Sequence, residues 1–194
     1  MPCSYERQRT GFYQRGVLNE LGVPLGPNVN AFEEALESFV GENKRIVALS
    51  AGTAAIHLAL IQLGVQPGDE VICQSFTFCA SANPVTYVGA IPVFLDSEET
   101  TWNMSPVLLE EAIQDRIVKT GKKPKAIIPV HLYGMPAKID GICAIAEKYE
   151  IPVVEDAAEA LGSEYKRRKC GTFGTYGALS FNGNKMITTS GGEL

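Results

Sequence analysis

Two segments of the sequence carry residues that could do chemistry together. Lys185 ends the run Ser180–Lys185 (SFNGNK), whose small and polar residues can leave an amine uncovered by any packed helix. Asp156 follows the apolar run Ile151–Val154, so we expect it at the rim of a sheet, where α/β proteins bind ligands. Taken alone, the lysine could be a solvated surface charge and the acid a helix cap. Together, an amine and a carboxylate are what pyridoxal phosphate (PLP) requires: covalent attachment and an anion for its pyridinium nitrogen.

A third segment has the composition of an anion site. Ser50–Thr53 (SAGT) closes a predicted strand and opens a predicted helix, and its small residues let the backbone approach a ligand closely. Free N–H groups and the dipole at a helix start favour an anion such as a phosphate. Ser50 or Thr53 could instead simply cap the helix, which is the more ordinary interpretation of the tetrad alone.

These segments belong to a series that runs in order from about residue 24 to the end of the chain. Its members are LGP at 25–27, AGTAA at 51–55, PGDEV at 67–71, SFTF at 75–78, HLYG at 131–134, EDAAE at 155–159 and SFNGNK at 180–185. With this series the sequence resembles the DegT/StrS family of PLP-dependent nucleotide-sugar aminotransferases, which have fold type I. Glu159, the Gly-Asn-Lys form and the following Ile187–Thr189 are most similar to the bacillosamine and perosamine branches, which aminate C4 of a keto-sugar nucleotide.

The resemblance implies roles for individual residues. Lys185 would attach the cofactor and Asp156 would pair with its ring nitrogen, while Glu159 would lie near its 3-hydroxyl group. Gly52 and Thr53 would belong to the cradle for its phosphate. The hydroxyl of Ser180 would also bind the phosphate. Phe78 would stack on the ring.

Some of these positions have other interpretations. Phe78 taken alone is typical of a core residue, and Phe76 is the less favoured stacking candidate. His131 and Tyr133 follow a predicted strand at the same rim, where they could touch cofactor or sugar, or serve the core or a loop. Glu155 is predicted to be structural.

The implied reaction moves an amino group from a donor, glutamate by resemblance, to a 4-keto sugar on a nucleotide, and leaves a 4-amino sugar. A sugar 3-aminotransferase and a PLP-dependent sugar dehydratase are the alternatives. The dehydratases have histidine at the lysine position, so Lys185 argues against them. A catalytically silent fragment is a further alternative, because the sequence stops at Leu194, where members of the family continue into a small C-terminal domain.

The resemblance divides the chain into a poorly matched segment, 1–23, and a PLP-binding large domain, 24–194, without the small domain. Family active sites lie at a dimer interface, so a homodimer is expected. The length of 194 residues fits one domain, and 45% hydrophobic with 20% charged residues is ordinary for a globular protein. The net charge of −5 argues against nucleic acid and anionic membranes as partners.

The cysteine and histidine counts add two expectations. Five cysteines without a C-x-x-C pair indicate reduced thiols and a cytoplasmic protein. With only two histidines and no zinc-type cysteine spacing, the sequence predicts no metal site.

Hydrophobic periodicity predicts alternating strands and helices. The strands are expected at 45–49, 70–74, 91–95, 125–130 and 151–154, with short strand-like pieces at 178–181 and 186–189. The helices are expected at 29–40, 53–63, 79–88, 106–118 and 139–149. Such alternation predicts an α/β fold, here the large domain of a fold-type I aminotransferase, with a mainly parallel sheet covered by helices on both faces.

Overall fold

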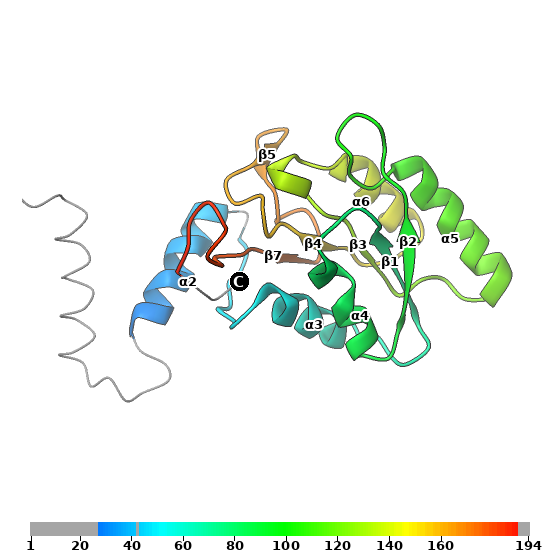
Figure 1. Cartoon of the computed structure of the whole chain (residues 1–194), viewed down its shortest axis with the longest axis horizontal. Coiled ribbons are helices and arrows are strands. Elements are labelled where there is room, and N and C mark those ends of the chain that lie inside the picture. The colour runs from blue at the N-terminus through cyan, green and yellow to red at the C-terminus, as the bar shows by residue number, and fades with distance from the viewer. Residues whose placement is uncertain (1–26, 42, 190–194) are drawn as a thin grey trace, which may run out of the picture. The chain divides into compact units, whose positions relative to one another are not determined.

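The computed structural model describes residues 27–41 and 43–189 of the chain. The described residues fall into two compact units, with the boundary between Ala48 and Leu49. The interpretation of residues 1–23 as a poorly matched segment lies outside the described residues. Figure 1 shows the helices and strands of the chain with their labels.

The first unit contains the helix α2, Pro27–Val40, which confirms the helix predicted from the spacing of its apolar residues. The strand predicted at 45–49 is wrong, because residues 45–48 form no strand in the described part of the chain. Two glutamates one turn apart on α2 take the backbone N–H groups that a strand would use. Glu37 accepts from the amide of Ile46 at 3.1 Å, and Glu33 accepts from that of Ala48 at 2.7 Å.

The second unit is built on a parallel sheet. Its hydrogen-bonded strands have the order β2-β1-β3, and a second pair, β4-β7, is also parallel. Single parallel bridges join Ile127 to Val153 and Val130 to Asp156, so β4 continues the sheet beside β3. The strands are β1 Glu70–Gln74, β2 Ile91–Leu95, β3 Ala126–Ile128, β4 Val154–Asp156 and β7 Tyr176–Ala178.

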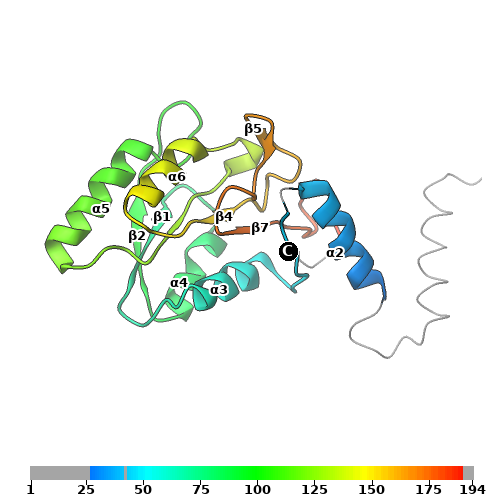
Figure 2. The same ribbon diagram turned by 180° about the vertical axis from the view of Figure 1, so that it is seen from behind.

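Helices cover both faces of this sheet, as the sequence predicted. Figures 1 and 2 show α3 and α4 on one face and α5 and α6 on the other. The helices are α3 Gly52–Gln62, α4 Asn83–Tyr87, α5 Pro106–Thr120 and α6 Ile139–Lys148. None of the described helices combines the length and the apolar character needed to cross a bilayer.

Successive side chains of a strand point to opposite faces of the sheet, so the core has two layers. Val71 and Cys73 of β1 pack with Ile56 and Leu60 of α3, whereas Ile72 between them packs with the residues of α5 and α6. All five are almost fully buried. Because burying an aliphatic side chain contributes ~1.5–3 kcal/mol, both faces of the strand stabilise the fold. This explains why the strands form continuous apolar runs in the sequence.

The predicted helix at 79–88 is broken in the structure. It consists of a 3₁₀ turn, η1 Cys79–Ser81, followed by the short helix α4. Pro84 lies in the first turn of α4, where its missing N–H costs no hydrogen bond. Since proline is incompatible with the interior of a longer helix, the chain restarts the helix at this point.

The strands near the C-terminus are displaced from their predicted positions. β4 begins at the last residue of the predicted strand 151–154, and β7 ends at the first residue of the predicted piece 178–181. No strand forms at 186–189. A hairpin of β5, Glu164–Tyr165, and β6, Arg168–Lys169, was not predicted.

Close backbone packing explains one glycine in this region. Gly177 lies in β7 beside the loop at Gly171, and a Cβ atom at Gly177 would approach the Gly171 carbonyl oxygen to 2.1 Å. Any other residue there would push the loop away from β7. Gly177 is therefore required for the close packing of this loop against β7.

Candidate active site

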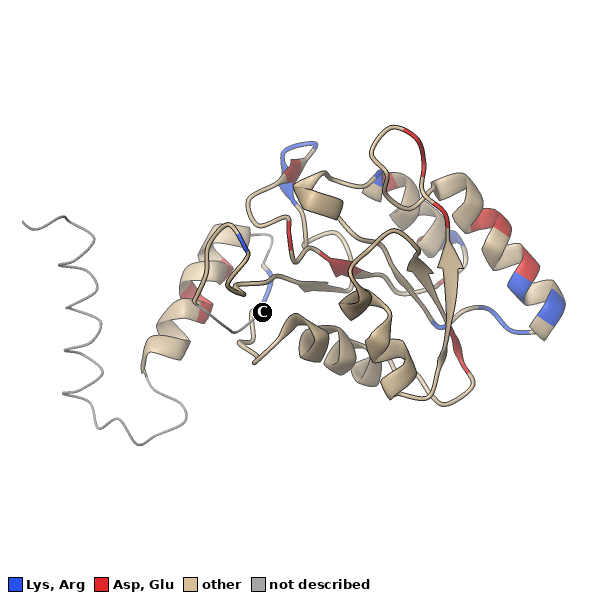
Figure 3. Ribbon diagram, in the orientation of Figure 1, with Lys and Arg blue, Asp and Glu red and all other residues tan. Residues whose placement is uncertain are grey.

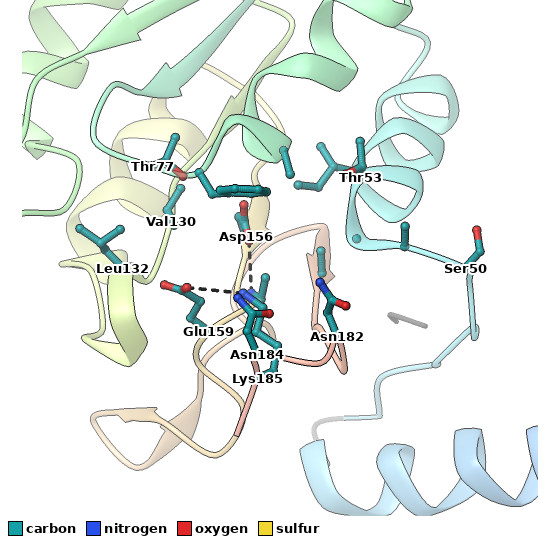
Figure 4. Close-up of a pocket in the computed structure, with 17 residues that line it drawn as sticks. Ser50, Thr53, Thr77, Val130, Leu132, Asp156, Glu159, Asn182, Asn184 and Lys185 are labelled. Atoms are coloured by element: carbon teal, nitrogen blue, oxygen red, sulfur yellow. Dashed lines mark hydrogen bonds and ion pairs between the residues drawn. The ribbon is translucent and has the colours of Figure 1, made fainter. Parts of the chain in front are cut away.

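A pocket of about 280 Å³ lies within the second unit. It is lined by the start of α3, the segment before η1, the end of β4 with the turn after it, and the loop that ends at Lys185 (Figure 4). These are four of the segments in which the sequence placed chemistry. The predicted site residues that line it are Gly52, Thr53, Phe78, Asp156, Glu159 and Lys185.

Lys185 reaches the pocket from a turn in which its own N–H donates to the carbonyl of Asn182 at 2.9 Å. Its Nζ lies 3.4 Å from Oε1 of Glu159, and its side chain is only 16% exposed (Figure 4). The other oxygen of Glu159 accepts from the backbone N–H of Tyr133 at 2.9 Å. Glu159 therefore joins the lysine loop to the segment that follows β3.

Asp156 ends β4 and is almost fully buried. Its Oδ2 accepts a hydrogen bond from the Ser81 hydroxyl at 2.5 Å, and its Oδ1 accepts from the N–H of Ala158 at 3.2 Å. Burial raises the pKa of Asp156 above its usual value, while these two hydrogen bonds and the charge of Lys185 oppose that rise. The site thus holds a carboxylate in an apolar setting next to an amine.

The start of α3 presents free backbone donors to the pocket. Ala51 occupies the N-cap and no side chain caps the helix, so the alternative that Ser50 or Thr53 serves as a cap is wrong. The N–H of Ala54 donates to the carbonyl of Ala51 at 2.8 Å. Because the first amides of a helix lack intrahelical partners, those of Gly52 and Thr53 remain available.

The two phenylalanines after β1 differ in position. Phe78 lines the pocket and is 74% exposed, so it is not the core residue that its type suggests. Phe76 does not line the pocket, and its ring makes an edge contact with Trp102 at 5.9 Å between centroids. The structure therefore favours Phe78 over Phe76 as the aromatic residue of this site.

Ser180 is the one predicted site residue that the structure does not bring to the pocket wall. It is almost fully buried beneath the loop, where its Oγ accepts from the N–H of Asn182 at 3.4 Å. The neighbouring Asn182 and Asn184 line the pocket instead. Their polar type was visible in the SFNGNK run, but only the fold of the turn shows which side chains face inward.

His131 and Glu155 form a buried pair behind the sheet edge, which decides the open question about His131. Nδ1 of His131 accepts from the N–H of Ala137 at 3.0 Å, and its Nε2 donates to Glu155 at 2.9 Å. Glu155 also accepts from the amides of Gly171 and Gly174 at 2.9 and 2.5 Å. The prediction that Glu155 is structural is consistent with these contacts, and His131 serves the core. Tyr133, in contrast, is exposed.

Two hydroxyl-bearing residues at the site were also missed from the sequence. Thr77 lines the pocket, and Ser81 lies behind it against Asp156. Both lie close to Phe78, but nothing in their spacing predicted a contact with a carboxylate on another strand. In the described part of the chain, no three His, Cys, Asp or Glu side chains come together in a way that could hold a metal ion.

Comparison with known proteins decides the family. The sequence profile of the DegT/DnrJ/EryC1/StrS aminotransferase family matches residues 12–193. The chain belongs to this family. A crystal structure of a DegT DnrJ EryC1 StrS aminotransferase from Brucella abortus has 38% sequence identity and a TM-score of 0.87, covering 96% of this chain and 52% of that one. The fold-type I architecture predicted from the sequence is thereby confirmed.

Relatives within the family share much of this chain. EpsN of Bacillus subtilis (strain 168), named as a candidate pyridoxal phosphate-dependent aminotransferase, is 57% identical over 171 residues. GDP-perosamine synthase of Caulobacter vibrioides is 44% identical over 170 residues. Each alignment covers 88% of this chain and 44% of the relative.

The name of a third relative specifies a 3-oxo sugar, whereas the sequence led us to expect a 4-keto sugar. UDP-2-acetamido-2-deoxy-3-oxo-D-glucuronate aminotransferase of Pseudomonas aeruginosa is 44% identical over 163 residues, or 84% of this chain and 43% of that protein. The chain spans less than half the length of these three curated relatives.

Proposed function

We propose that residues 24–194 form the PLP-binding part of a nucleotide-sugar aminotransferase, with Lys185 as the residue that attaches the cofactor. One observation carries the proposal: an amine, a buried carboxylate and an uncapped helix start line the same pocket. The name of EpsN, which refers to pyridoxal phosphate, adds support.

The groups in the pocket fit the chemistry of PLP. The free amides of Gly52 and Thr53 suit a phosphate, because a helix N-terminus carries partial positive charge. The buried carboxylate of Asp156 suits a protonated ring nitrogen, and the exposed face of Phe78 suits an aromatic ring. When bound, PLP supplies a ring that withdraws electrons from the carbon that loses a proton.

The chain's own residues then perform the proton transfers and the positioning. The Nζ atom of Lys185 accepts and returns the proton of the reacting carbon, and Glu159 holds this amine at the pocket wall. Asp156 keeps its charge toward the ring nitrogen and so stabilises the protonated ring. Phe78 would pack against the ring, and Asn182 and Asn184 would contribute polar groups on the lysine side.

For the substrate we favour a 4-keto sugar on a nucleotide, with glutamate as the amino donor. GDP-perosamine synthases among the relatives support this choice, as do Glu159 and the Gly-Asn-Lys run of this chain. The Pseudomonas relative, whose name specifies a 3-oxo sugar, keeps 3-amination as the second candidate. Lys185 disfavours the dehydratase alternative, and a silent fragment predicts no reaction with any sugar.

A single-turnover experiment distinguishes these candidates. The chain is loaded with pyridoxamine phosphate and mixed with equal amounts of a 4-keto or a 3-keto nucleotide sugar, and the amino sugar formed is measured by mass spectrometry. We expect the 4-amino product to form faster than the 3-amino product. Faster reaction of the 3-keto sugar would reassign the substrate, and reaction with neither sugar would support the silent fragment.

The cysteines also bear on our proposal for the compartment and redox state of the protein. The described cysteines Cys73, Cys79, Cys143 and Cys170 are free thiols. Burial raises the pKa of Cys73 and of Cys170 to about 12, so both remain protonated and unreactive at neutral pH. Reduced, buried thiols support our proposal that the protein is cytoplasmic.

The surface of α3 and α4 supports the proposed homodimer. Neither helix contains a Lys, Arg, Asp or Glu residue, as Figure 3 shows, although Leu58, Ile61 and Tyr87 are 40%, 51% and 57% exposed. His57 and Tyr87 make an edge contact at 5.6 Å between ring centroids, so the two helices present one continuous surface. A helix that is apolar all round is normally covered, and a second copy of the chain would cover it.

Replacing Ile61 with glutamate should therefore weaken self-association. A buried charge without a partner at an interface costs several kcal/mol, so we expect the dissociation constant of the dimer to rise by at least about 100-fold. Analytical ultracentrifugation would measure it. Val118→Glu is the matched control, because Val118 is 84% exposed at the end of α5, away from this surface. Equal weakening by the two substitutions, or no weakening by either, would contradict the assignment of this face.

A further inference from the structure

Behind the proposed cofactor site, a chain of hydrogen bonds runs from the pocket wall to Asp156. The hydroxyls of Thr77 and Ser81 are 2.7 Å apart, and the Ser81 hydroxyl is 2.5 Å from Oδ2 of Asp156. Thr77 and Asp156 both line the pocket, and Figure 4 labels them among its lining residues. Ser81 is completely buried between them.

The direction of this chain follows from the number of protons. Ser81 has one hydroxyl proton, and an ionised carboxylate can only accept, so Ser81 donates to Asp156. The Ser81 oxygen is then the acceptor for the hydroxyl proton of Thr77. The other carboxylate oxygen takes the N–H of Ala158, so each oxygen of Asp156 has one fixed donor. Protonation of Oδ2 would leave Ser81 without an acceptor on this side.

The backbone explains why these hydroxyls lie where they do. The chain leaves β1 at Gln74 and turns through η1, in which the N–H of Ser81 donates to the carbonyl of Phe78 at 3.1 Å. One turn therefore presents Phe78 to the pocket and Ser81 to Asp156. The position of the aromatic residue and the orientation of the carboxylate are tied to each other through this short piece of chain.

Other ionisable groups surround Asp156, and their effects are distinct from that of Ser81. Lys185 and Glu159 line the same pocket, Glu155 precedes Asp156 on β4, and His131 lies next to its backbone, where the His131 N–H donates to the Asp156 carbonyl at 3.0 Å. Lys185 and His131 lower the pKa of Asp156 through their charge by less than Ser81 does, and Glu155 is occupied by its own donors. Besides desolvation, which raises the pKa of Asp156, the hydrogen bond from Ser81 is the leading influence and lowers it.

We propose that Ser81 is a positioning residue: its hydroxyl keeps the Asp156 carboxylate ionised and turned into the pocket, and Thr77 orients Ser81 for this task. The proposal rests on the proposed function, because an ionised Asp156 is what a protonated ring nitrogen needs. It concerns residues that no cofactor atom has to touch. Ser81 acts through Asp156 alone.

The test measures the titration of Asp156 itself, in the chain without added cofactor. Carbon-13 NMR of labelled aspartate, assigned with Asp156→Asn, gives its pKa. A hydrogen bond to a charged group is worth enough to move a pKa by about one to two units, so Ser81→Ala should raise the pKa of Asp156 by that amount. Thr77→Val removes only the outer hydroxyl and should produce a smaller rise in the same direction.

Ser105→Ala is the matched control, since Ser105 is also buried but caps α5, where its Oγ accepts from the N–H of Leu108. It should leave the pKa of Asp156 unchanged. An unchanged pKa in folded Ser81→Ala would overturn the proposal, as would an equal shift in the Ser105 variant. If Ser81→Ala does not fold, Thr77→Val decides: a rise in the pKa of Asp156 supports the proposal, and an unchanged or lower pKa overturns it.

A second readout separates this proposal from the proposed function. With PLP bound, the acidic limb of the pH–rate profile of the half-reaction should shift to higher pH by about one to two units in Ser81→Ala. The rate should recover at high pH, where Asp156 is ionised again. Loss of rate at every pH would indicate structural damage and contradict a positioning role. If wild-type chain binds no PLP, the proposed function fails, while the titration of Asp156 still tests Ser81.

Discussion

Replacing Lys185 with alanine should abolish covalent attachment of PLP and nearly all turnover. The amine is the group in the pocket that can bond to the cofactor and carry a proton at its Nζ atom. Positioned acid–base groups contribute about 10²- to 10⁴-fold, so the half-reaction should slow by at least that factor. Stopped-flow absorbance would measure the rate, and borohydride treatment followed by mass spectrometry would measure attachment.

The same variant should keep its fold and a weaker, noncovalent affinity for PLP. The start of α3, Asp156 and Phe78 remain in place, and removing an amine from the pocket wall leaves both core layers unchanged. Lys166→Ala provides the control, because Lys166 is 68% exposed and pairs with Asp140 on the surface. A borohydride-stable adduct that persists in Lys185→Ala and disappears in Lys166→Ala would show that we have chosen the wrong lysine.

Asp156→Asn should impair the chemistry more than the binding. Asparagine keeps the size of the side chain but removes the charge opposite the ring nitrogen, a contact worth ~1.5–3 kcal/mol. We therefore expect the half-reaction rate to fall by a larger factor than the affinity for PLP, when both are measured on the same preparation. Collapse of affinity together with a normal rate in the bound fraction would refute this role.

Asp156→Asn should also make the cofactor-free chain more stable relative to wild type as the pH rises. Because burial raises the pKa of Asp156 in the folded state, the folded chain binds more protons than the unfolded chain between pH 3.8 and the raised value. The contribution of Asp156 to stability therefore falls as pH rises through that interval and then levels off. The asparagine side chain of the variant does not titrate, so the stability of the variant relative to wild type should increase over the same interval. Urea unfolding at several pH values would measure this, and a constant difference would contradict a raised pKa.

Much of this fold could be predicted because the central strands β1, β3 and β4 are buried on both faces. The apolar residues of β1 and β2, each strand beginning two residues after a glycine, placed both strands at their observed limits, and a serine followed by proline placed the start of α5. The predicted strand at 45–49 failed for a reason that lies outside its own sequence. Its amides are satisfied by the carboxylates of Glu33 and Glu37, which no periodicity of that segment could indicate.

The residues of the candidate site also fall into those that the sequence could predict and those that it could not. Lys185, Asp156 and the start of α3 could be found because each belongs to a local run whose composition suits its chemistry. Ser81 could not, because its contact with Asp156 joins residues 75 positions apart. Ser180 belonged to a convincing run, yet its side chain is buried beneath the loop. Local sequence thus indicated which loops meet at the sheet edge, whereas the direction of each side chain depends on the turn that carries it.

The central claim is that Lys185 holds PLP in this pocket, and peptide mapping of the reduced adduct tests it most directly. The chain is incubated with excess PLP, treated with borohydride and digested, and the modified lysine is located by tandem mass spectrometry. We predict that the phosphopyridoxyl group is found on Lys185 and that Asp156→Asn leaves its position unchanged. Labelling spread over the exposed lysines with Lys185 unmodified would contradict the account.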